Sequence, residues 1–210
     1  MADSMSATDF AQCVEPSRAK RLKTATHETH MRLDQTVMAC DPFSSLERYR
    51  LFLKMQHRVF FDVDALCFHR ELIALVPDLP ERRQLHLVEQ DFEDLGLVVP
   101  SPELEPVFGE GAIDVPTALG YLYVTEGSNL GAAFLIKEAK KIGLSESYGA
   151  RHLAGAEEGR ARSWRTFTNA LDAVDLSPAE EARAVAGAEA SFERVFVHVE
   201  SAFGKVQTLR

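Results

Sequence analysis

Apolar residues recur every three or four positions through most of the chain, a period that predicts α-helices rather than strands. Helices are expected over residues 17–40, 45–76 with one interruption, 80–95, 116–143, 158–174 and 177–203, with a short segment near 149–154. Prolines and glycines separate them, most densely in a loop over residues 96–114. Because no stretch alternates apolar and polar residues as a strand would, the sequence predicts an all-α, single-domain helical bundle.

The expected domain covers residues 17–205, and residues 1–16 are expected to form a flexible N-terminal tail. Ser17 is positioned to cap the first helix, and Ser177-Pro-Ala-Glu180 has the form of a capping box with proline at the first helical position. With 210 residues and 46% hydrophobic content, the chain can bury one sizeable core, and no linker or internal repeat divides it.

Two glycines lie inside the helix expected over residues 116–143, where glycine is costly. Gly127 and Gly131 are one turn apart, and each costs about 1 kcal/mol relative to alanine in a helix interior. On a helical wheel they share a stripe with Gly120, Tyr123 and Phe134, so bare backbone is flanked by aromatic rings. Two explanations are open: this face packs closely against another helix, or a flat ligand lies on it.

The first helix carries a histidine that favours a ligand. His30 lies at the margin of an apolar stripe, where a histidine is either hydrogen-bonded in the core or a metal ligand, and His27 lies toward the polar face. Asp34 is expected to accept the Nδ1 proton of His30 and so leave Nε2 free for a metal. Lys23, two turns earlier, would meet an anion about 10 Å away. An axial histidine, a rim cation and a glycine-floored aromatic groove together predict haem.

Two motifs carry a resemblance to a known family. Leu22-Lys-Thr-Ala-Thr-His-Glu-Thr-His30 resembles the proximal-helix motif of haem oxygenases. Tyr121-Leu-Tyr-Val-Thr-Glu-Gly-Ser-Asn-Leu-Gly-Ala-Ala-Phe134 resembles the distal-helix motif of the bacterial, haem-degrading branch that serves iron acquisition. Tyr148-Gly-Ala-Arg-His-Leu-Ala154 is also similar to that branch. The likeness runs in order from about Arg18 to Gly204, which implies a haem oxygenase bundle with haem between the proximal and distal helices.

The resemblance assigns a role to residues of both helices. It makes His30 the proximal ligand of the haem iron. It makes Gly127 and Gly131 the distal backbone that approaches the haem, with Ser128 beside them as part of the catalytic site. Phe134 is expected to contact the haem at the end of the glycine stripe.

Other positions bear on the orientation of the haem. In relatives that cleave at the α-meso carbon, a lysine and a tyrosine at the positions of Lys23 and Tyr123 hold the propionates. Because both are present here, the resemblance favours α-cleavage. Gln56 stands where relatives have a glutamine in a distal hydrogen-bond network, so it is expected near the haem. Phe60 stands where at least one relative has a histidine, which is a departure from that network.

The resemblance implies oxidative cleavage of haem to biliverdin, CO and ferrous iron. Haem is then both cofactor and substrate, so no protein base or nucleophile is required. The reaction uses O₂ and electrons from an external reductase or ferredoxin-type donor, because the chain has no nucleotide-binding fingerprint. Iron acquisition is the expected role, and bilin supply is possible. The alternatives are a non-enzymatic haem carrier or buffer, and a thiamin-degrading type of bundle enzyme with Cys67 as its nucleophile.

Charge and cysteine content exclude other classes. A net charge of −9 and a pI near 5.3 argue against a nucleic-acid partner. No run of about 18 apolar residues and no signal peptide is present, so a cytoplasmic protein without a membrane span is expected. The protein is also expected to be a monomer. Cys13, Cys40 and Cys67 lack CxxC spacing and are expected to stay reduced.

The remaining candidate residues are expected to be structural. Arg151 and His152 are expected in buried hydrogen bonding, and Trp164 in packing. Polar neighbours in the sequence predict that three histidines face solvent: His57, His86 and His198.

Overall fold

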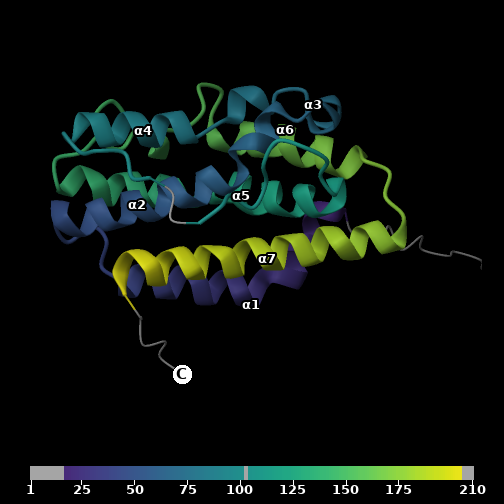
Figure 1. Cartoon of the computed structure of the whole chain (residues 1–210), viewed down its shortest axis with the longest axis horizontal. Coiled ribbons are helices and arrows are strands. Elements are labelled where there is room, and N and C mark those ends of the chain that lie inside the picture. The colour runs from purple at the N-terminus through teal and green to yellow at the C-terminus, as the bar shows by residue number, and fades with distance from the viewer. Residues whose placement is uncertain (1–16, 102–103, 205–210) are drawn as a thin grey trace, which may run out of the picture.

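The protein is built of helices in the residues that the computed structural model describes, 17–101 and 104–204 (Figure 1). The seven α-helices of this part are α1 (Arg18–Ala39), α2 (Leu46–Val63), α3 (Arg70–Leu75), α4 (Leu85–Asp94), α5 (Val115–Lys141), α6 (Arg160–Ala173) and α7 (Pro178–Phe203). Short 3-10 helices are η1 (Asp64–Phe68), η2 (Pro80–Arg82) and η3 (Arg151–Leu153). The described residues contain no strand, only isolated bridges near Ser145, so the all-α prediction is confirmed.

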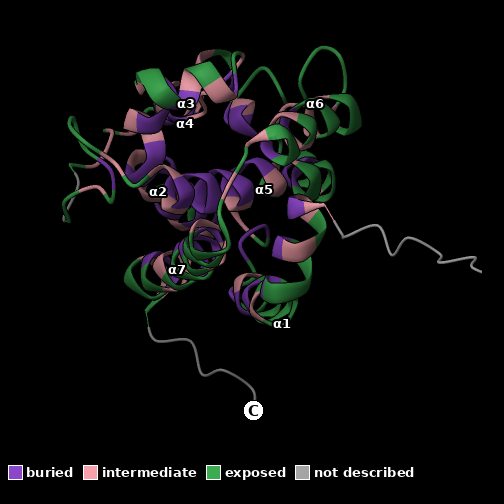
Figure 2. Ribbon diagram, turned by 90° about the vertical axis from the view of Figure 1, so that its right-hand side faces the viewer, coloured by how far each residue is buried: buried purple, intermediate pink, exposed green. Residues whose placement is uncertain are grey.

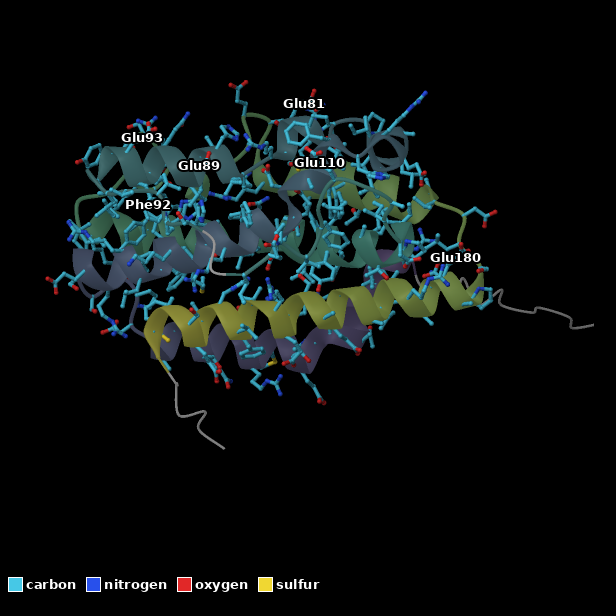
Figure 3. All side chains as sticks on the ribbon, viewed as in Figure 1. Glu81, Glu89, Phe92, Glu93, Glu110 and Glu180 are labelled. Carbon is cyan, nitrogen blue, oxygen red and sulfur yellow. The ribbon has the colours of Figure 1, made fainter. Side chains whose placement is uncertain are left out.

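Helix ends fall close to where capping residues predicted them. The Ser17 hydroxyl accepts a hydrogen bond from the Lys20 amide at 3.4 Å and caps α1. Ser177 and Glu180 form the expected capping box, and Figure 3 shows Glu180 at the start of α7. The expected interruption of the second helix is η1, and the helix expected from residue 80 is divided into η2 and α4. The tail over residues 1–16, with Cys13, and position 205 lie outside the described residues.

The central contact of the bundle is between α5 and α7, which pack together more extensively than any other pair of elements. Figure 2 shows α5 in the middle of the bundle, with buried residues around it. Two glycines allow this approach. A Cβ at Gly120 would lie 2.1 Å from the Ala184 carbonyl oxygen, and one at Gly187 would lie 2.4 Å from that of Thr117. Helix α1 packs mainly against α7 and meets α5 at far fewer positions, so α7 is the common neighbour of both.

Two histidines that were expected to face solvent are buried. The His198 side chain is 3% exposed, and its Nε2 lies 2.6 Å from Oδ2 of the buried Asp62. Arg194 donates two hydrogen bonds to the same carboxylate, at 2.7 and 3.0 Å. His57 is buried against the ring of Phe92, and burial, followed by the nearby Arg58 charge, lowers its pKa. The prediction is therefore wrong for His57 and His198, because their partners come from distant segments. It is also wrong for His86, which is partly buried.

His152 forms the buried hydrogen bond that the sequence predicted, whereas the prediction is only partly right for Arg151, whose side chain is 34% exposed. The ring Nδ1 of His152 lies 2.6 Å from Oδ2 of Asp91, and both side chains are fully buried. Arg151 pairs with Asp94 through two hydrogen bonds, at 2.7 and 3.0 Å. These contacts join η3 to α4.

None of the described helices is long and apolar enough to cross a membrane.

Candidate haem site

Helix α1 presents His30 on an exposed surface. The side chain is 58% exposed, and its ring contacts Phe192 of α7 at a centroid distance of 5.5 Å. Asp34 lies 3.5 Å from Nε2, not beside Nδ1. The expected role of Asp34 is therefore wrong in this structure: the ring packs on Phe192, and the carboxylate meets the nitrogen that was expected to be free. At 3.5 Å, between exposed groups, the pair is too weak to fix that nitrogen against a metal. His27 is exposed, as expected.

Lys23 lies on the same helix, two turns before His30, and is exposed. Its side chain has no hydrogen-bond or ion-pair partner among the described residues. The ammonium group is therefore available to an anion from outside the protein. Its neighbours Arg18 and Arg21 differ, because both are paired with Glu181 of α7.

The glycine stripe of α5 divides into two parts with different explanations. Gly120 is buried against the backbone of α7, so close helix packing accounts for it. A Cβ at Gly131 would meet no heavy atom within 4 Å, so nothing in the protein requires glycine there. A Cβ at Gly127 would lie 3.6 Å from the Trp164 ring, which is ordinary contact. The packing explanation is therefore right for Gly120, and it does not explain Gly127 or Gly131.

Aromatic residues flank this bare backbone. Tyr123 is buried, and its ring lies 5.6 Å from that of Trp164. Burial raises the pKa of Tyr123, so its hydroxyl keeps its proton and can donate a hydrogen bond. Phe134, one turn beyond Gly131, is 52% exposed. Trp164 packs against Tyr123 and Phe167, so its expected packing role is confirmed.

Ser128 and Gln56 are the polar candidates. The Ser128 hydroxyl donates a hydrogen bond to the Thr125 carbonyl at 2.7 Å, so its proton is used within the helix and its oxygen remains an acceptor. Gln56 is half-buried on α2, a helix that contacts α5. Phe60, on the next turn of α2, is buried in the core and cannot donate a hydrogen bond.

Large apolar side chains are exposed on both helices. Met31 and Met38 of α1 and Leu130 and Phe134 of α5 are each at least 40% exposed. Apolar groups left uncovered beside functional candidates commonly mark a ligand groove. The residues fit haem: an accessible imidazole, uncovered apolar side chains, a free ammonium group and backbone without side chains at Gly131. Among the described residues no group of three or more His, Cys, Asp or Glu could hold a metal ion.

The sequence analysis missed a charged cluster beside the distal glycines. Glu126 is buried next to Gly127, and its Oε2 accepts a hydrogen bond from Arg82 of η2 at 2.8 Å. Burial raises the pKa of Glu126 despite the Arg82 charge. One signal was available: Glu126 is the only charged residue between Val115 and Ile136. A charge inside a buried helix requires a partner, but the sequence does not say which residue it is.

Comparisons with known proteins relate this chain to heme oxygenases. A family model described as heme oxygenase matches residues 108–200. The chain is 39% identical over 177 residues to the heme oxygenase PigA of Pseudomonas aeruginosa, covering 84% of this chain and 88% of that protein. The crystal structures of the NO- and CO-bound heme oxygenase from Neisseria meningitidis include a match with a TM-score of 0.85 and 38% identity, covering 92% of this chain and 95% of that chain.

The helical fold and these comparisons define a haem-binding bundle enzyme. The chain belongs to the haem oxygenase family. It is therefore an enzyme that degrades haem, with haem as both substrate and cofactor and a proximal histidine as the iron ligand.

Proposed function

We propose that this protein cleaves haem to biliverdin, CO and ferrous iron, with the haem held between His30 of α1 and the backbone of residues 127–131 of α5. The observation that carries the proposal is Gly131. A glycine in the middle of a 27-residue helix costs about 1 kcal/mol, and no neighbouring atom requires it. A ligand that lies against the bare backbone explains why no side chain stands there.

The proposal gives each residue of the site a role. The accessible imidazole of His30 holds the iron on the proximal side. Gly127 and Gly131 leave room on the distal side for a small diatomic molecule, and backbone groups there can hydrogen-bond to it directly or through water. The Ser128 oxygen is an acceptor for such a water, and Gln56 a further partner. Bound haem supplies the metal centre at which O₂ is activated, so the protein needs no base or nucleophile of its own.

We propose α-meso cleavage, on the basis of Lys23 and Tyr123. The ammonium group of Lys23 is free among the described residues, and the Tyr123 hydroxyl is protonated. Both can therefore donate hydrogen bonds to carboxylates. Propionates held by these two donors would fix the rotation of the haem in its plane, and that rotation decides which meso carbon faces the bare backbone.

The electron source and biological role belong to the same proposal. Electrons come from a separate reductase or ferredoxin-type donor, and the role is iron acquisition by a monomeric, cytoplasmic protein. The resemblance to the bacterial haem-degrading branch supports the role. Light scattering after size-exclusion chromatography tests the monomer, and growth with haem as the sole iron source tests the role.

Haem turnover in vitro tests the activity. Purified protein is mixed with haem, and ascorbate or a reductase is added under O₂ while the Soret band and the biliverdin absorbance are followed. The proposal requires the Soret band to decay as biliverdin forms and chromatography to identify the α isomer. Bound haem that persists unreacted would indicate a carrier, and no haem spectrum at all would refute the site.

A further inference from the structure

Arg82 is a buried residue with contacts to three segments of the chain. It is 9% exposed and lies in η2, a turn that carries none of the haem-site residues. Its Nη1 donates to Glu126 Oε2 at 2.8 Å and to Ser163 Oγ at 3.1 Å. Its Nη2 donates to Asp78 Oδ2 at 2.6 Å and to the Ser163 carbonyl at 3.1 Å. One guanidinium group thus joins α5 to α6.

The residues that Arg82 joins are sequence neighbours of Gly127 and of Trp164, which packs beside Gly127 and which we take with it as the distal wall of the proposed haem site. Glu126 precedes Gly127 on α5, and Ser163 precedes Trp164 on α6. The Trp164 ring lies 3.6 Å from the place where a Cβ of Gly127 would be. Any change in the spacing between Glu126 and Ser163 must therefore change the spacing between the bare backbone and the indole.

Apolar side chains pack against the Arg82 guanidinium on one side only. A groove of about 540 Å³ opens beside these residues, lined by Arg82, Glu126, Ser163 and Trp164 among others. On the other side the guanidinium lies 5.7 Å from the centre of the Phe167 ring. Because the groove side offers no packing partner, charged hydrogen bonds connect α5 to α6 there: those of Arg82, and one from Arg160 of α6 to the Asn129 carbonyl of α5 at 2.8 Å. Arg82 is the one of the two that reaches Glu126, directly beside Gly127.

We propose that Arg82 and Glu126 are positioning residues of the haem site, which set the separation of Gly127 and Trp164 and through it the freedom of haem to rotate. The inference rests on the proposed function, because it takes Gly127 as part of the distal wall. Neither residue touches the ligand. Both act by holding the wall that the ligand meets.

Glu126→Gln tests whether the Arg82–Glu126 pair sets the separation of Gly127 and Trp164, and Asp64→Asn is the control. Asp64 accepts two hydrogen bonds from Arg83, at 2.7 and 3.1 Å, so it belongs to a neighbouring, more exposed carboxylate–guanidinium pair that makes no hydrogen bond to α5 or α6 among the described residues. The first readout is the fluorescence of the haem-free protein, in which Trp164 is the only tryptophan. The second is the isomer composition of the biliverdin that each variant produces.

We expect Glu126→Gln to shift the Trp164 emission maximum and to raise the share of minor biliverdin isomers by about threefold or more, equivalent to about 0.7 kcal/mol. Asp64→Asn should change neither readout. If Glu126→Gln leaves both readouts at wild-type values, or if Asp64→Asn shifts them equally, the proposal is wrong. If the wild type makes no biliverdin, the proposed function fails. The Trp164 fluorescence then still decides whether the Arg82–Glu126 pair sets the separation of Gly127 and Trp164.

A second variant covers the case in which Glu126→Gln does not fold. Removing one partner of a buried ion pair is costly, whereas replacing both with apolar residues of similar volume is often tolerated. The double variant Arg82→Met/Glu126→Met therefore keeps a similar side-chain volume and removes the ion pair. With wild-type circular dichroism, it should shift both readouts in the same direction. Unchanged readouts in a folded double variant would show that the two residues only fill space.

Discussion

Gly131→Ala should make the haem-free protein more stable and the haem complex weaker. The position lies inside α5, and an added Cβ would meet no heavy atom within 4 Å. The full helix-propensity gain of about 1 kcal/mol is therefore expected, because nothing opposes it. For a domain of this size that gain raises the melting temperature by about 2–4 °C. If haem lies against this backbone, the same methyl group stands in its place and lowers its affinity.

Gly120→Ala is the matched control. Its Cβ would lie 2.1 Å from the Ala184 carbonyl oxygen and 2.6 Å from the Ala188 amide nitrogen, and backbone atoms cannot move aside cheaply. Overpacking of this kind costs about 1–3 kcal/mol or more, so this variant should be destabilised. The assay is thermal unfolding with and without haem, since a ligand raises stability according to its affinity. Our explanation of the glycines is refuted if Gly131→Ala destabilises the haem-free protein, or if haem stabilises it as much as the wild type.

Three further predictions follow from individual side chains. His30→Ala should abolish the Soret spectrum of the histidine-ligated complex, and an unaltered spectrum would assign the ligand to another residue. Lys23→Ala and Tyr123→Phe should each move product from the α isomer to other isomers, as measured by chromatography; a constant isomer profile would show that the propionates are held elsewhere. Hydrogen bonds from His198 and Arg194 outweigh burial and hold the pKa of Asp62 below its usual 3.8, so Asp62 stabilises the fold above about pH 4 and loses this effect as pH falls further. Asp62→Asn should therefore cost about 3 kcal/mol at neutral pH in urea unfolding, with the difference from wild type shrinking in acid; a pH-independent difference would contradict the linkage.

Periodicity and capping residues were sufficient to predict most of the fold. Ser17 and Ser177 cap helices because their short side chains reach free backbone amides within one turn, and such local interactions are legible in the sequence. The division between η2 and α4 was missed, because a single turn of helix is set by what it packs against. Arg82 of η2 contacts residues of α5 and α6.

Contacts between distant segments explain the predictions that were wrong or left open. Gly120 and Gly131 lie on the same stripe of one helix and cannot be distinguished from the sequence. In the structure the α7 backbone packs against Gly120, whereas a Cβ at Gly131 would meet no heavy atom within 4 Å. His198 was expected at the surface because its neighbours in the sequence are polar, yet its partner Asp62 is 136 residues away. Sequence indicated which residue types the chemistry needs, but the partners that bury or expose them depend on the assembled bundle.

The structure of the haem-loaded protein tests the central claim most directly. We predict that the iron is bound by Nε2 of His30, with the distal face of the ring against the backbone of residues 127–131. A crystal structure with the iron bound to another residue, or with the distal face away from that backbone, would contradict the account.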